Sequence, residues 1–147
     1  MSIPLSGDWV AGRIETEMDG VVTGFNQTDV WVRPDDLVRV GRLLRDDPQI
    51  DLQMLNSISA VDYVECFELV YHFRSLRLNT TFVLKARSYD RESPSFPSLT
   101  GVWPGADLQE REVWDLMGVS FTDHPNLKRI LLWEGFPGHP LRKDFIR

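Results

Sequence analysis

Residues 67–86, FELVYHFRSLRLNTTFVLKA, decide the fold of this 147-residue chain. Apolar side chains alternate with mostly polar ones over residues 67–74 and again over residues 80–87. Such alternation is typical of β-strands that bury one face. Residues 77–79 between the two runs, Arg-Leu-Asn, suit a hairpin turn. The sequence therefore predicts an antiparallel β-hairpin at the centre of the sheet.

Further elements are predicted before the hairpin. Thr28–Val32 is alternating and rich in β-branched residues, which favours a strand. Pro34 suits the first turn of a helix, and this helix is expected to run to about Asp46, before Pro48 ends it. Weaker alternation over residues 51–58 predicts another strand.

Three more features are predicted after the hairpin. A short strand around Ser98–Trp103 is expected to join the same sheet. A second helix is predicted over Asp107–Met117, with Asp107 as its N-cap and Gly118 as the left-handed residue that ends it. The remainder is expected to be compact but irregular.

The chain is predicted to hold one domain, because 147 residues accommodate one domain and hardly two. Residues 1–20 are polar, contain three glycines and show no strand or helix period. We expect them to form a flexible N-terminal arm. Residues 21–147 are then the single domain, including a C-terminal interaction tail.

Composition excludes several classes of protein. The chain is 42% apolar and 26% charged, close to the average of soluble globular proteins, which excludes disordered, collagen-like and membrane-embedded chains. Its net charge of −6 disfavours a general nucleic-acid binder. Cys66 is the one cysteine of the sequence, so it forms no internal disulfide and supplies too few thiolates for an iron–sulfur cluster. The N-terminus has no signal-peptide pattern.

Self-contained catalysis is disfavoured by the motifs. The sequence has no GxGxxG, GxxxxGK[ST], GxSxG, HExxH or paired CxxC. Glu110, Arg111, Glu112 and Asp115 form a charged stretch on the second predicted helix, which suits either a solvated face or a network with a partner chain. A paired-carboxylate catalytic site is disfavoured, since Glu110 and Glu112 point to different helix faces.

Two histidine–proline pairs and the tail allow more than one interpretation. His124 and His139 lie fifteen residues apart, with Asp123 or Glu134 as further candidate metal ligands. Structural histidines that hydrogen-bond beside a turn are favoured over a metal site, because no sulfur donor lies near. The tail 138–145, GHPLRKDF, suits both a frayed end and an interface anchor.

Residues 110–132, EREVWDLMGVSFTDHPNLKRILL, resemble the signature of the 30-kDa subunit (the C subunit of bacteria) of respiratory complex I, NADH:quinone oxidoreductase. The resemblance extends to SISAVD at 57–62, YHFRS at 71–75 and GHPLRKDF at 138–145. It covers about residues 28–147, with the motifs in the family's order.

The resemblance implies an α+β fold, a two-layer sandwich with helices packed on one face of a mainly antiparallel or mixed β-sheet. It also implies a structural and assembly subunit that is non-catalytic and binds no cofactor. Such a subunit sits in the peripheral arm of a proton-pumping NADH:quinone oxidoreductase, on the cytoplasmic side of the membrane. Its expected neighbours are the 49-kDa D subunit, which holds the quinone site, and the B and I subunits, while FMN, iron–sulfur clusters and quinone belong to other subunits.

Alternatives remain open at this point. One is the equivalent subunit of a membrane-bound hydrogenase, or of a complex fed by ferredoxin or a deazaflavin. Others are a free-standing enzyme that uses His72, His124 or His139, and a stand-alone adaptor domain. Under the favoured hypothesis, charge-assisted hydrogen bonds to partner subunits come from ten residues. These are Glu110, Arg111, Glu112, Asp115, His124, Arg129, His139, Arg142, Lys143 and Asp144.

Overall fold

A computed structural model describes residues 1–145 of the chain, so residues 146–147 of the predicted domain lie outside it. The elements in chain order are β1 (Ile3–Pro4), α1 (Gly7–Glu17), β2 (Val22–Phe25), β3 (Asp29–Val32), the 3-10 turn η1 (Pro34–Asp36), α2 (Leu37–Asp46), β4 (Met54–Asp62), β5 (Phe67–Ser75), β6 (Thr80–Ser88), β7 (Ser95–Pro97), α3 (Ala106–Met117) and β8 (Ser120–Thr122). None of the helices in residues 1–145 has the length and apolar character needed to cross a membrane.

The predicted hairpin is confirmed as β5 and β6, which pair antiparallel from Phe67 opposite Ser88 to Ser75 opposite Thr80. It lies within a mixed sheet of order β2-β3-β6-β5-β4, with β1 paired to β6 off this path. Strand β3 runs parallel to β6, and β4 runs antiparallel to β5. The other two strands predicted before and beside the hairpin are therefore confirmed, although β4 begins at residue 54 and continues to residue 62.

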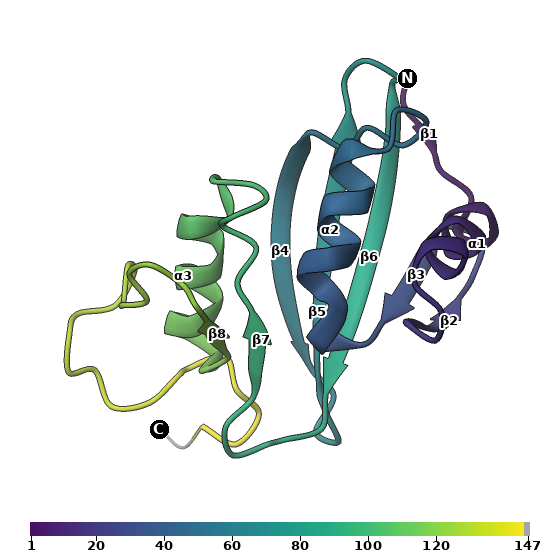
Figure 1. The fold of residues 1–147 in the computed structure, drawn as a ribbon. Coiled ribbons are helices and arrows are strands. Elements are labelled where there is room, and N and C mark those ends of the chain that lie inside the picture. Colours follow the sequence, from purple (N-terminus) through teal and green to yellow (C-terminus); the bar gives the residue numbers. More distant parts are fainter. Residues whose placement is uncertain (146–147) are drawn as a thin grey trace.

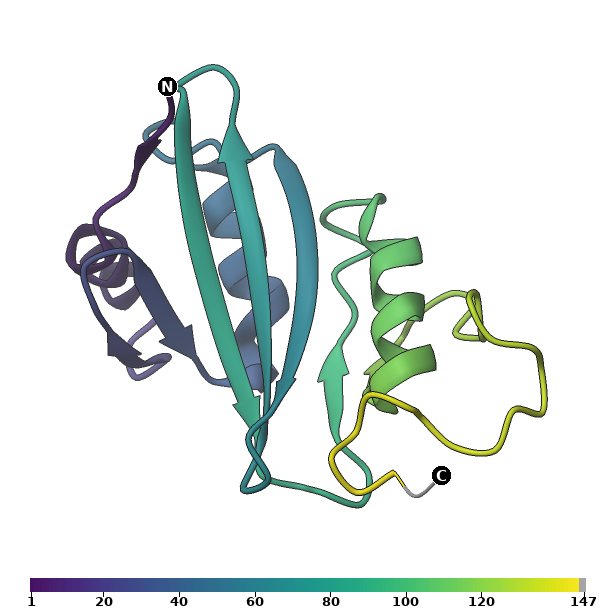
Figure 2. The ribbon, with the colours of Figure 1, turned by 180° about the vertical axis from the view of Figure 1, so that it is seen from behind.

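Helix α2 covers one face of the sheet, as Figures 1 and 2 show from opposite sides. Its buried residues Leu37, Val40 and Leu44 join the inward residues of β5 in one core. The Trp103 ring lies 4.7 Å from the Phe73 ring in this core. Buried residues of α1 and α3 belong to the same core. The predicted α+β class, with helices against one face of a mixed sheet, is confirmed.

The expected flexible arm is wrong for residues 7–17, which form helix α1 at the β2–β3 end of the sheet (Figure 1). Its buried residues are Gly7, Val10, Ala11 and Ile14, a stripe with helical spacing. Two members of the stripe are small, so the apolar period is weak in the sequence. The packed helix is part of the domain rather than a separate arm.

The expected strand at Ser98–Trp103 is also wrong. Those residues form turns, in which the Leu99 carbonyl accepts hydrogen bonds from the N–H groups of Val102 and Trp103. The strand lies just before them as β7, and it pairs in parallel with β8 in a separate two-stranded sheet instead of extending the main one. Strand β8 falls within the part expected to be irregular.

The second predicted helix is confirmed as α3, with a different N-terminus. Its N-cap is Gly105, and no side chain caps it, so the assignment of Asp107 as the cap is wrong. Gly118 ends the helix with a φ of 72°, as predicted. A Cβ atom there would also lie 2.7 Å from the His139 ring. This glycine is therefore required both by its backbone conformation and by close packing.

Alanine substitutions at two glycines of α1 test whether this helix packs against the rest of the domain. We expect Gly7→Ala to lower the free energy of unfolding by about 1–3 kcal/mol, because the new Cβ would overlap the Asn26 carbonyl oxygen. Gly12→Ala is the matched control. Gly12 is exposed with open space around it, so alanine is expected to stabilise the helix by up to about 1 kcal/mol. Thermal unfolding of both variants measures this, and equal behaviour would contradict a docked helix.

Candidate functional site

The chain after β8, residues 123–145, has no helix or strand, yet one buried carboxylate fixes its middle. Asp115 of α3 is fully buried. Its Oδ1 atom accepts a hydrogen bond from Arg129 Nη1 at 2.7 Å. Its Oδ2 atom accepts three backbone N–H groups, those of Ile130, Leu131 and Leu132, at 3.2, 2.7 and 2.9 Å. We call residues 123–145 the C-terminal segment.

These donors also decide the charge state of Asp115. Burial raises the pKa of its carboxyl, but the N–H groups of residues 130–132 and the Arg129 guanidinium outweigh burial and lower the pKa below its ordinary value. Asp115 is therefore an ionised carboxylate inside the protein, and every donor that compensates it comes from the C-terminal segment.

Arg129 closes the loop that follows. While Nη1 pairs with Asp115, Nη2 donates to the carbonyl oxygens of Phe136 and Gly138 at 2.9 and 2.8 Å. The guanidinium carbon lies 5.6 Å from the centre of the Phe136 ring, within the range of a cation–π contact. Residues 129–138 are thus a loop closed by one side chain.

Arg111 and His139 attach the same segment to α3 at two further points. Arg111 donates to the carbonyl oxygens of Lys128 and Arg129 at 3.2 and 3.3 Å. His139 Nδ1 lies 2.9 Å from the Asp115 carbonyl oxygen, and its ring packs 4.9 Å from that of Trp114. Helix α3 therefore holds the segment along its length.

A second buried carboxylate, Glu110, ties α3 to the turn after β7. It accepts hydrogen bonds from Ser98 Oγ at 2.7 Å and from Leu99 N–H at 2.8 Å. Burial raises the pKa of its carboxyl despite these donors.

His124, whose side chain is also buried, places Nε2 3.1 Å from the Asp107 carbonyl oxygen. Both histidines that were candidate ligands are thus hydrogen-bonded in the fold, and residues 1–145 contain no cluster of three or more metal-ligating side chains.

The end of the C-terminal segment is anchored on Asp62, the last residue of β4. This carboxylate is 2% exposed and accepts hydrogen bonds from Arg91 and from the Lys143 N–H group. Burial raises the pKa of Asp62, but Arg91, Lys143 N–H and Val64 N–H outweigh it and lower the pKa to about 2.

Two arginines complete this anchor. The guanidinium carbons of Arg91 and Arg142 lie 4.4 and 5.0 Å from the centre of the Phe67 ring. Asp144 pairs with both arginines, at 3.2 and 2.9 Å. Sequence reasoning missed Asp62, Phe67 and Arg91 as partners of the tail, because they are 53 to 81 residues from their partners in the chain.

The ten residues predicted to contact a partner lie together on α3 and the C-terminal segment. Not all of them are accessible at the surface. Glu110 and Asp115 are fully buried, and so is the His124 side chain, so the prediction that they contact a partner directly is wrong. Desolvation of a carboxylate requires donors close by, and these donors come from the chain itself. Glu112 is exposed on the side of α3 opposite Glu110, as predicted.

Large apolar side chains of this segment face solvent. Leu131, Trp133 and Leu141 are 60%, 64% and 59% exposed. Trp133 packs edge-on against Phe136, with ring centres 5.7 Å apart. Exposed aromatic and aliphatic side chains on a fixed backbone are typical of a protein interface.

Residues 30–147 match the family model described as respiratory-chain NADH dehydrogenase, 30 Kd subunit. The chain belongs to this family. It is 48% identical over 118 residues to the C subunit of the NADH-quinone oxidoreductase of Roseiflexus sp. strain RS-1, covering 78% of this chain and 67% of that protein. It is 41% identical to the corresponding C subunit of Roseiflexus castenholzii over 147 residues, covering 95% of this chain and 84% of that protein.

A solved structure supports the fold of this 30-kDa subunit family member. A chain from the membrane-bound sulfane sulfur reductase, an archaeal respiratory membrane complex, superposes with a TM-score of 0.76 at 24% identity. The match covers 95% of this chain and 85% of that one. The family model and the two relatives confirm the sequence-based assignment to the complex I 30-kDa family.

Asp115→Ala is expected to release the C-terminal segment, because three backbone N–H groups and the Arg129 charge lose their acceptor. Breaking such a buried pair destabilises by about 3–5 kcal/mol. Amide hydrogen exchange at residues 130–132 is then expected to quicken about a hundredfold or more. Glu112→Ala, on the exposed side of the same helix, is the control and should stay within about 0.5 kcal/mol of the wild type. Unchanged exchange in Asp115→Ala would contradict the role given to this carboxylate.

Asp62 predicts a pH dependence. Because its pKa in the folded chain is about 2, below the ordinary 3.8, the carboxylate stabilises the fold fully above pH 4, and this contribution is lost as the pH falls toward 2. Between pH 5 and pH 2 the wild type should lose about 2 kcal/mol more than Asp62→Asn. Denaturant unfolding across this range measures the difference, and parallel curves would show that the anchor is not ionic.

Proposed function

We propose that this chain is a structural and assembly subunit, without a cofactor of its own, of the peripheral arm of a proton-pumping NADH:quinone oxidoreductase. The observation that most supports this proposal is that the hydrogen-bonded C-terminal segment exposes Leu131, Trp133 and Leu141 to solvent. Family membership supports the same function, since the relatives carry the name of a subunit of that enzyme.

The energetics of the segment favour a role in recognition. Burial of the Asp115 charge is unfavourable in itself, and apolar residues of similar volume often stabilise a fold as well or better. The hydrogen bonds of Asp115 and Arg129 give residues 129–138 a defined shape without a helix or strand. A preorganised loop loses little conformational entropy on binding, so its exposed apolar residues can act as interface anchors.

We propose that the exposed charges around this loop set the orientation of the partner. Glu112 and Lys143 are exposed, and their side chains make no hydrogen bond or ion pair within residues 1–145. Arg111, Arg142 and Asp144 keep part of their polar surface accessible beside them. Rim charges of this kind contribute more to registry and association rate than to affinity.

The 49-kDa D subunit, which holds the quinone site, is the proposed docking partner, with the B and I subunits nearby. FMN, iron–sulfur clusters and quinone are then held by other subunits, and this chain meets the membrane only through them, on the cytoplasmic side. The presence of one cysteine in the sequence supports this division, because a cluster needs more thiolates. A complex fed by a hydrogenase module, ferredoxin or a deazaflavin is distinguished by the absence of NADH-oxidising subunits from the purified complex.

Trp133→Ala combined with Leu131→Ser is expected to weaken co-purification with the partner subunits about tenfold or more, since anchor residues carry most of the binding free energy. The thermal stability of the isolated chain should change little, because both side chains are exposed. Leu76→Ala, at an equally exposed leucine in the β5–β6 turn, is the matched control. Wild-type co-purification of the double variant, or stoichiometric iron or flavin in the purified chain, would overturn the proposal.

A further inference from the structure

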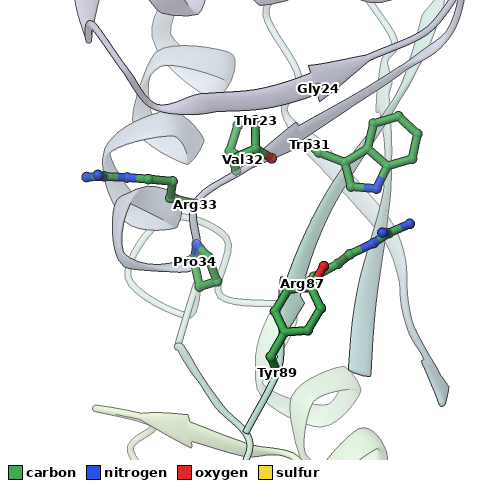
Figure 3. Close-up of a pocket in the computed structure, with 8 residues that line it drawn as sticks. All are labelled: Thr23, Gly24, Trp31, Val32, Arg33, Pro34, Arg87 and Tyr89. Carbon is green, nitrogen blue, oxygen red and sulfur yellow. The ribbon is translucent and has the colours of Figure 1, made fainter. Parts of the chain in front are cut away.

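A groove of about 550 Å³ lies beside β3, between the start of η1 and the chain just after β6 (Figure 3). Its lining includes two arginines and no anion; Arg33 pairs with Asp36 at 2.9 Å, which leaves Arg87 as the cation considered for a ligand. Figure 3 shows Trp31, Arg87 and Tyr89 on one side of the groove, while the Arg33 side chain points away from them. None of the lining residues belongs to the C-terminal segment.

A buried carboxylate holds the cationic side of this groove in place. Glu68 Oε2 accepts hydrogen bonds from Arg87 Nε at 2.7 Å and from Trp31 Nε1 at 2.9 Å. Glu68 is 1% exposed, whereas the Arg87 side chain is 42% exposed, so the negative charge lies inside and the positive charge outside. Lys85 Nζ lies 4.8 Å from the centre of the Trp31 ring and fixes it further.

The outer edge of the Arg87 guanidinium is available to a ligand. Only its Nε donates to Glu68, and within residues 1–145 its Nη atoms donate to no carboxylate or carbonyl group. The Tyr89 hydroxyl lies beside it, and Glu68 together with Tyr89 raises the pKa of Arg87 above its ordinary value. A guanidinium edge that is permanently charged and held by its Nε binds a carboxylate through two parallel hydrogen bonds.

We propose that this groove binds an Asp or Glu side chain of a partner protein chain, with Arg87 donating to the carboxylate while Trp31 and Tyr89 flank it. A protein partner is favoured because Trp, Tyr and Arg are the residues that most often dominate interface energetics. The inference rests on the proposed assembly role, and it adds a second, electrostatic contact to the apolar one on the C-terminal segment.

Two variants test the groove in the assembled complex. Arg87→Lys keeps the charge that compensates Glu68 but loses the two-pronged donor, and Tyr89→Ala removes a side chain that is exposed. Each is expected to lower the fraction of chain retained on the partner subunits about tenfold, with unchanged thermal stability of the isolated chain. Arg77→Lys is the matched control, because Arg77 pairs with Asp51 at 2.8 Å but lies outside the groove. Wild-type retention of both groove variants would overturn the inference.

A photo-reactive benzophenone amino acid in place of Tyr89 identifies the occupant. Irradiation of the assembled complex should capture a partner peptide that contains Asp or Glu, and replacing that partner residue by its amide should lower retention about as much as Arg87→Lys does. Capture no greater than from the same probe at Leu76, or capture of a lipid, a small molecule or a peptide without carboxylates, would overturn the inference. If Trp133→Ala with Leu131→Ser weakens assembly and Arg87→Lys does not, this inference fails while the proposed function stands.

Discussion

The Asp115 carboxylate is charged and fully buried, so it must find hydrogen-bond donors inside the protein. All of its side-chain donors come from residues 129–132. The chain after β8 is thereby folded back onto α3 without forming a helix or strand. The need of Asp115 for these donors sets the shape of the segment. On it depend the loop closed by Arg129, the packing of His139 and the exposure of Leu131 and Trp133.

The two ends of the C-terminal segment are secured by different means, which gives the surface its shape. Near α3 the constraint is the Asp115 carboxylate. It accepts hydrogen bonds from three backbone N–H groups and so fixes the main chain of residues 130–132. Near β4 the constraint is Asp62, together with two arginines over the Phe67 ring. Between them lies a loop whose apolar residues Leu131 and Trp133 are exposed, and the proposed assembly role gives these residues a partner to bind.

The sequence predicted the centre of the fold well, because strand alternation in β5 and β6 and the apolar stripe of α2 are strong and local. It failed for α1, whose buried stripe includes Gly7 and Ala11, and small residues add little to an apolar period. It also misplaced β7, since a three-residue strand that pairs with β8, more than twenty residues later, has no local pattern.

The site was predicted in part. The sequence identified the charged residues of α3 and of the tail, but it did not predict which of them are buried and which face solvent. Which face of a helix is buried depends on what packs against it. The hydrogen-bond donors to Glu110 and Asp115 come from turns and loops far along the chain, which no local pattern shows. The exposure of Leu131 and Trp133 likewise depends on the loop shape that Asp115 and Arg129 impose, and no short sequence pattern predicts that shape.

Hydroxyl-radical footprinting of the free chain and of the intact complex tests the central claim most directly. We predict that Trp133 and Leu131 are readily oxidised in the free chain and protected in the complex, while Leu76 reacts equally in both. Equal oxidation of Trp133 in the two samples would show that the segment held by Asp115 does not face a partner, and would contradict the account.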